Sequence, residues 1–169
     1  MKKLLLPLLI TLSTTILAKN PESLFGVYIN DNVLDYFTKE ELKSKYRDRA
    51  RGFYKLELKN PPVSNKDYSD RLWLRFDKNN KIAEINSQKR FIDSETCEKV
   101  EYGVRRQLEN KYNIEFVRNP NTKYGFYKWV GDNGIGTECK VFDNHTTLFI
   151  LLNTKEYYEK YKEFLDSRI

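Results

Sequence analysis

The stretch DSETCEKVEYGVRRQLENKY, residues 93–112, decides the fold because it is the clearest helix signal in the chain. Asp93 or Ser94 can cap its first amides, and Asn113 can end it in a left-handed conformation. Its apolar residues recur at spacings of three and four, which places them on one stripe of a helix: Cys97, Val100, Val104 and Leu108. This stripe must be buried against other elements.

Gly103 is the one local conflict in the helix. Glycine inside a helix costs about 1 kcal/mol relative to alanine. The lack of a side chain at this position would let another backbone pass close by.

The chain has two cysteines, Cys97 in this helix and Cys139 in a later segment with strand character. In an oxidising compartment, two thiols with no third candidate predict one disulfide bond. In the chain-entropy model the bond would stabilise the fold by about 4 kcal/mol. The alternatives are two free thiols or a redox-active pair, but the cysteines form no C-x-x-C motif.

The first 18 residues have the pattern of a secretory signal peptide. A charged start precedes an apolar run over residues 4–17, and Ala18 is a small residue before a cut at Lys19. The run is shorter than the roughly 20 residues that span a bilayer, and no second run of that length follows. We expect a mature chain, residues 19–169, that is periplasmic or secreted without a stable membrane span. An uncleaved N-terminal anchor is the alternative.

The charge of the chain is mildly basic and evenly spread. Removing residues 1–18 takes away two lysines and no acidic residue, so the formal net charge falls from +6 to +4. The basic residues are mixed with acidic ones and form no basic block, which argues against nucleic acid as a partner. The mature length is that of one ordinary domain.

Strand signals fall in two groups, one on each side of the long helix. Alternating apolar and polar residues define most of them, and 146–152 is a near-continuous apolar run typical of a central strand buried on both faces. The predicted strands are 53–59, 72–76, 82–85, 114–117, 124–130, 137–142 and 146–152.

The connections inside each group are short, so we predict antiparallel pairing. Asn153 with Glu156 can box the start of a C-terminal helix, and Thr38 with Glu41 can box a second short helix to about Arg47. The result is a single α+β domain, a mostly antiparallel β-sheet packed on one face by the long central helix and the C-terminal helix. The disulfide would place Cys139, with Val141, on the helix side of the sheet.

Catalytic and metal-binding signals are weak. His145, the only histidine, lies in a predicted hairpin turn, so a serine or cysteine nucleophile has no marked base. One histidine and two bridged cysteines are too few for a zinc site. The turn at 77–81 has Asp77 and Asn79 spaced as in a calcium loop, but Lys81 stands where an oxygen ligand is needed. The sequence predicts no catalytic residue, metal or cofactor.

The segment GDNGIG, residues 131–136, is the only glycine-rich stretch. It precedes a strand instead of a helix and lacks the Gly-Lys-Ser/Thr ending of a phosphate-binding loop. A flexible hairpin turn is the better interpretation.

Aromatic residues are abundant, with 12 tyrosines, 10 phenylalanines and 2 tryptophans. Tyrosine and tryptophan combine large apolar area with a polar group, which favours binding surfaces. Trp73, Tyr127 and Trp129 fall on strand faces opposite the predicted core, flanked by Arg75 and Lys128. If the sheet leaves that face uncovered, these residues form a binding patch. The alternative is that loops or the N-terminal segment cover them.

Three segments resemble small exported bacterial proteins known only as hypothetical proteins. They are LFGVYINDN at 24–32, FDKNNKI at 76–82, and Cys97 followed by LENKY at 108–112. The resemblance covers most of the mature chain and implies no activity and no functional residue.

These observations favour a non-enzymatic binding protein of the cell envelope. Its partner would be an envelope protein or an extracellular ligand, held on the aromatic sheet face. One alternative is an inhibitor of an exported hydrolase, with residues 131–136 as the inserting loop. A second is an enzyme whose site the sequence does not reveal.

Overall fold

The computed structural model describes residues 18–48, 52–63, 66–118 and 125–167. All of the predicted signal peptide except Ala18 lies outside these residues. None of the helices in the described part of the chain combines the length and apolar composition that a membrane crossing needs.

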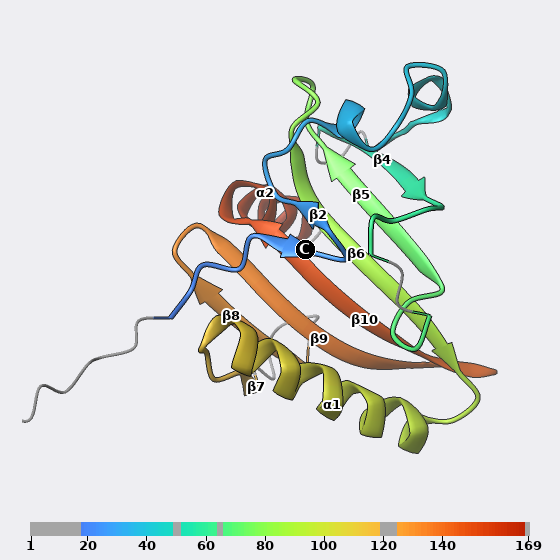
Figure 1. Ribbon diagram of the computed structural model, residues 1–169, viewed down its shortest axis with the longest axis vertical. Helices are drawn as coiled ribbons and strands as arrows, with labels where there is room; N and C mark the ends of the chain where they lie inside the picture. The colour runs from blue at the N-terminus through green and yellow to red at the C-terminus, as the bar shows by residue number, and fades with distance from the viewer. Residues whose placement is uncertain (1–17, 49–51, 64–65, 119–124, 168–169) are drawn as a thin grey trace, which may run out of the picture.

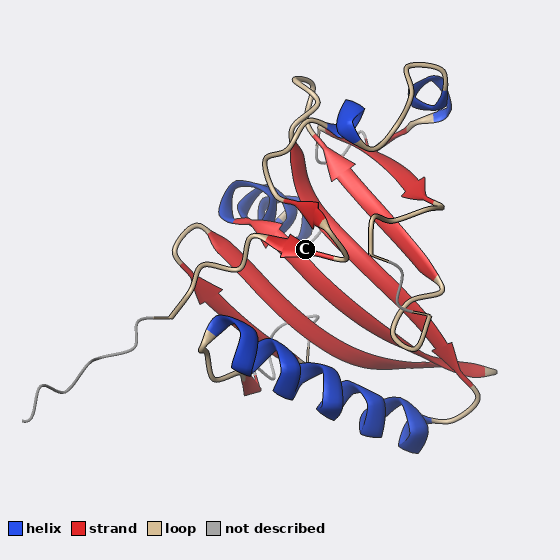
Figure 2. Ribbon diagram, viewed as in Figure 1, coloured by secondary structure: helices blue, strands red, loops and turns tan. Residues whose placement is uncertain are grey.

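The fold is α+β, as predicted, and is built on one eight-stranded antiparallel sheet of order β3-β4-β5-β6-β10-β9-β8-β7 (Figures 1 and 2). Its strands are β3 (Tyr46–Asp48), β4 (Phe53–Leu58), β5 (Arg71–Phe76), β6 (Ile82–Phe91), β7 (Val117–Arg118), β8 (Phe126–Val130), β9 (Asn133–Phe142) and β10 (His145–Thr154). A two-stranded sheet is formed by β1 (Ser23–Leu24) and β2 (Val27–Tyr28). The helices are α1 (Ser94–Tyr112) and α2 (Lys155–Asp166), with short 3-10 helices η1 (Val33–Asp35) and η2 (Glu41–Ser44).

The centre of the sheet is β10, which pairs with β6 on one side and β9 on the other. Leu148 and Leu152 of this strand point to one face and Leu151 to the other, and all three are fully buried. This confirms the prediction of a central strand buried on both sides.

The main core lies on one side of the sheet, here called the helix face. Cys97, Val104 and Leu108 of α1 pack there, beside apolar residues of the N-terminal segment such as Val27 and Val33 (Figure 1). The Cys97–Cys139 disulfide joins α1 to β9, with 6.0 Å between the two Cα atoms, which confirms the predicted bridge.

The ends of α1 are also as predicted. The Asp93 carboxylate accepts a hydrogen bond from the Thr96 amide at 2.7 Å, and Asn113 ends the helix with φ 52°. The expectation for Gly103 is wrong, because a Cβ atom added there would meet no described atom within 4 Å.

We therefore expect Gly103→Ala to raise the free energy of unfolding by about 1 kcal/mol, since it relieves the helix cost of glycine without a clash. Urea unfolding of the variant beside the parent protein measures this change. An unchanged or lower stability would show that the position needs glycine for a reason other than space.

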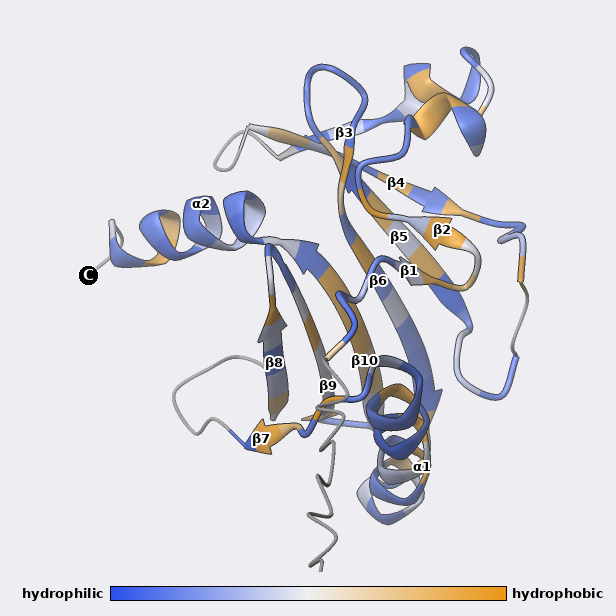
Figure 3. Cartoon of the chain, turned by 60° about the vertical axis from the view of Figure 1, so that its left-hand side comes forward, coloured by the Kyte–Doolittle hydropathy of each residue, from blue (hydrophilic) through white to orange (hydrophobic). Residues whose placement is uncertain are grey.

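The C-terminal helix lies on the face opposite α1, so the prediction that both helices share one face is wrong (Figure 3). Thr154 caps α2 in place of Asn153, its hydroxyl accepting from the Tyr157 amide at 3.2 Å. Tyr157 then packs on Phe53 with 5.0 Å between ring centroids, and Phe53 points away from the helix face.

The glycine-rich segment is mostly strand. Only Gly131 and Asp132 form the turn, and β9 begins at Asn133. Gly134 and Gly136 lie beneath the Tyr127 ring, where a Cβ atom on either would overlap that ring. These glycines make room for an aromatic side chain and do not form a flexible loop.

Two smaller predictions also differ from the structure. Thr38 and Glu41 do form a capping box, with 2.8 Å from the Thr38 amide to Glu41 Oε2, but only the 3-10 helix η2 follows. The short strand after α1 is Val117–Arg118 instead of 114–117. Neither change alters the order of the main elements.

Candidate functional site

The face of the sheet opposite α1 is covered only at one end. Tyr157 and Tyr158 of α2 lie over Phe53, Ala83, Tyr127 and Trp129, and no other described element packs on this side. The rest is here called the open face. Its side chains come from five strands: Glu57, Arg71, Trp73, Asn86, Gln88, Arg90, Thr147, Phe149, Glu138 and Lys140. Of these, Asn86 and Thr147 are themselves buried.

The strand register arranges these residues in rows across the sheet. Arg71 pairs with Gln88, which pairs with Phe149, which pairs with Glu138. One row further from α2, Arg90 and Lys140 both pair with Thr147. Aromatic, amide and basic side chains therefore alternate on one surface.

Trp73 is the predicted binding residue that lies on this surface. The Lys55 ammonium sits 3.9 Å from the centroid of its ring system. Its indole nitrogen is buried and has no hydrogen-bond partner among the described residues. An unsatisfied buried donor is uncommon in native proteins.

Tyr127 and Trp129 point to the same side of the sheet but lie beneath α2. Their ring centroids are 6.0 Å and 5.2 Å from that of Tyr158, and the Tyr127 hydroxyl donates to Asn153 at 2.6 Å. Lys128 alternates with them and points to the helix face, so it does not flank the patch as predicted. The structure thus separates these three residues from Trp73.

Arg75 lies two residues after Trp73 in β5. It is held by a buried network that the sequence analysis missed. It pairs with Glu84, whose side chain is 1% exposed. Glu84 also accepts from the Asn86 amide at 3.2 Å, and Asn86 accepts from Gln88 at 3.4 Å. The alternation of Glu84, Asn86 and Gln88 is the signal that could have revealed it, but the predicted strand ended at residue 85.

Glu84→Ala is expected to lower the free energy of unfolding by about 3 kcal/mol, because it leaves the Arg75 guanidinium in the sheet without its carboxylate. Glu84→Gln is the matched control, since its amide oxygen can still accept from Asn86. It should lower the free energy of unfolding by less than Glu84→Ala does. Urea unfolding compares the two. Equal losses would show that a neutral accepting oxygen cannot replace the charged carboxylate beside Arg75.

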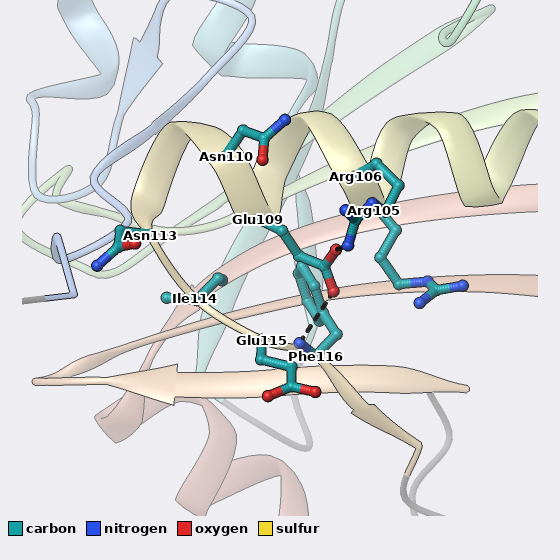
Figure 4. Close-up of a pocket in the computed structure, with 8 residues that line it drawn as sticks. All are labelled: Arg105, Arg106, Glu109, Asn110, Asn113, Ile114, Glu115 and Phe116. Atoms are coloured by element: carbon teal, nitrogen blue, oxygen red, sulfur yellow. Dashed lines mark hydrogen bonds and ion pairs between the residues drawn. The ribbon is translucent and has the colours of Figure 1, made fainter.

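A pocket of about 450 Å³ lies beside the C-terminal half of α1 (Figure 4). Three of its charged groups, Arg105, Arg106 and Glu109, already have partners. Glu109 pairs with Arg106 at 2.8 Å and accepts from the Phe116 amide at 3.3 Å. Arg105 pairs with Glu101 and stacks on Phe126, 3.9 Å from the ring centroid. These bonds hold α1 to the residues that follow it and supply no nucleophile or base.

Acid–base and metal chemistry find no support elsewhere in the described residues. No group of three His, Cys, Asp or Glu residues there could hold a metal ion. The Asp77 carboxylate instead closes its turn, accepting from the amides of Asn79 and Lys81, each at 2.8 Å. Burial raises the pKa of Tyr36 to about 12, helped by the hydrogen bond its hydroxyl donates to Asp31.

Comparison with protein-family models, with curated proteins and with solved structures finds no match to this chain. The resemblance to small exported bacterial proteins stays a prediction.

Proposed function

We propose that the mature chain is a non-enzymatic binding protein of the cell envelope, periplasmic or secreted, that holds a partner on the open face of its sheet. The main support for the proposal is that the helix face of the sheet is covered and most of the opposite face is not. Apolar residues of α1 and of the N-terminal segment close the helix face, whereas among described elements only α2 reaches the other side, and only at one end. A sheet face without a covering layer is a candidate interaction surface.

The chemistry of the open face fits a partner that offers acceptors and apolar groups. Arg71 is exposed and only loosely paired with Glu57 at 3.9 Å. An acceptor that displaces Lys55 could reach the Trp73 indole nitrogen and offset the cost of its missing hydrogen bond. Tryptophan and arginine contribute most to binding in many protein interfaces.

The test compares charge reversal at two sites. Arg71→Glu changes the open face, and Lys99→Glu changes the exposed side of α1 as a matched control. Each mature protein is cross-linked to isolated envelope fractions, and the retained proteins are identified and quantified. We expect Arg71→Glu to reduce the main cross-linked partner about tenfold and Lys99→Glu to leave it unchanged.

Circular dichroism must show that both variants fold. Equal cross-linking by the parent and Arg71→Glu would contradict the proposal. Trp129→Ala is a poor test, because that ring supports α2 and its loss would disturb folding. Trp73→Ala is the informative aromatic substitution.

No observation favours the hydrolase inhibitor. Its inserting loop was placed at residues 131–136, but Asn133, Gly134, Ile135 and Gly136 pair within the sheet and are buried. A two-residue turn is too short to enter an active site as a loop.

A further inference from the structure

Three large apolar side chains are exposed at the end of the sheet furthest from α2, and they are here called the apolar tip. Ile92 is 94% exposed, Val141 is 67% exposed and Phe142 is 40% exposed. Ile92 follows the last residue of β6, whereas Val141 and Phe142 are the last residues of β9.

The strand register places the three residues of the apolar tip at one corner of the sheet, with Val141 on the helix face and Phe142 on the open face. Thr146 of β10 pairs with Phe91 on one side and Val141 on the other, and His145 pairs with Phe142. Ile92 therefore lies next to the row of His145 and Phe142, and a strand spacing of about 4.8 Å places the backbones of Ile92 and Phe142 roughly 10 Å apart. Figure 1 shows that β6 and the β9–β10 hairpin end side by side in a projecting corner.

Basic side chains flank the apolar tip on the open face. Arg90 and Lys140 are exposed and share Thr147 as cross-strand neighbour, and the Lys140 ammonium is 5.7 Å from the Phe142 ring centroid. Of the nearby acids, Asp93 accepts from Thr96 at the start of α1 and Asp143 lies in the hairpin turn. Asp70 is paired with Lys89.

We propose that the apolar tip inserts into the interfacial region of a lipid bilayer with anionic headgroups, where Arg90 and Lys140 meet the phosphates. Exposed aliphatic and aromatic side chains beside cations are the composition of peripheral membrane anchors. The predicted mature charge of +4 adds a favourable long-range attraction to an acidic surface.

The test uses the mature protein and two kinds of vesicle, one of phosphatidylglycerol with phosphatidylethanolamine and one of phosphatidylcholine alone. Sedimentation measures the bound fraction. We expect binding to the anionic vesicles that weakens in 0.5 M salt, and little binding to phosphatidylcholine. No binding to anionic vesicles, or equal binding to both kinds, would overturn the proposal.

Substitutions then locate the contact. Ile92→Ser with Val141→Ser should lower the partition coefficient about tenfold or more, because two aliphatic side chains lose their favourable burial. Val117→Ser is the control, since this valine is also exposed, at 60%, but belongs to the edge strand β7. Retained binding by the double variant, or equal loss in the control, would overturn the proposal. Trp73→Ala, which leaves the net charge unchanged, separates this inference from the open-face proposal and should leave vesicle binding unchanged.

Discussion

Replacing both cysteines, as Cys97→Ala with Cys139→Ala, is expected to lower the free energy of unfolding by about 4 kcal/mol. The bridge closes a loop with a sequence separation of 42 residues, so it restricts the unfolded chain strongly. It also fixes α1 to β9 at the N-terminal end of the helix, where Cys97 is fully buried. Urea unfolding of the oxidised parent and the double variant measures the difference.

Reductant provides the internal control for this prediction. Reduction should lower the urea concentration at the unfolding midpoint of the parent toward that of the double variant. It should leave the midpoint of the double variant unchanged. If the reduced and oxidised parent unfold at the same urea concentration, then the bridge constrains little of the unfolded chain. In that case packing alone holds α1 on the sheet.

The features predicted correctly from the sequence are those that depend on local pattern. The α1 stripe, the Asp93 cap and the Asn113 end all follow from helix periodicity and capping chemistry within one segment. The disulfide followed because only two cysteines were available. The helix signals need no knowledge of distant residues, and the disulfide, although it joins distant residues, needed only the cysteine count.

The position of α2 could not be predicted in the same way. Side chains alternate between the two faces of a strand, so moving the helix start by one residue changes the face on which the helix packs. The prediction used Asn153 as the cap, whereas Thr154 caps α2 and Asn153 points to the Tyr127 hydroxyl. The wrong prediction of an aromatic patch follows from the wrong face for α2, because α2 covers Tyr127 and Trp129.

The two glycines under Tyr127 show a contact that lies outside any one segment. Gly134 and Gly136 belong to β9, and the ring above them belongs to β8, where Tyr127 pairs with Gly136. Considered alone, GDNGIG indicates a turn. Its spacing of two between glycines, following a strand with a tyrosine and a tryptophan, was the available sign of a ring packed flat on a sheet.

Gly134→Ala is expected to cause the largest loss of any single substitution considered, about 5 kcal/mol of unfolding free energy. The new Cβ atom would overlap the Tyr127 hydroxyl and lie 2.9 Å from its Cε1 atom. The ring has little freedom to move, because Trp129 and Tyr158 pack against it and Asn153 holds its hydroxyl. The substitution would therefore break a buried hydrogen bond and displace the first turn of α2.

A double-mutant cycle tests whether the tyrosine ring is the cause. Tyr127→Leu alone should destabilise the protein, since the Asn153 side chain, in a residue 1% exposed, loses its donor. Combined with Gly134→Ala it should cost less than the sum of the two single changes, because the branched side chain leaves space for the new methyl group. Strict additivity would place the cause in the β9 backbone instead. Gly103→Ala, which adds the same methyl group in open space, separates the clash from any general effect of the glycine-to-alanine change.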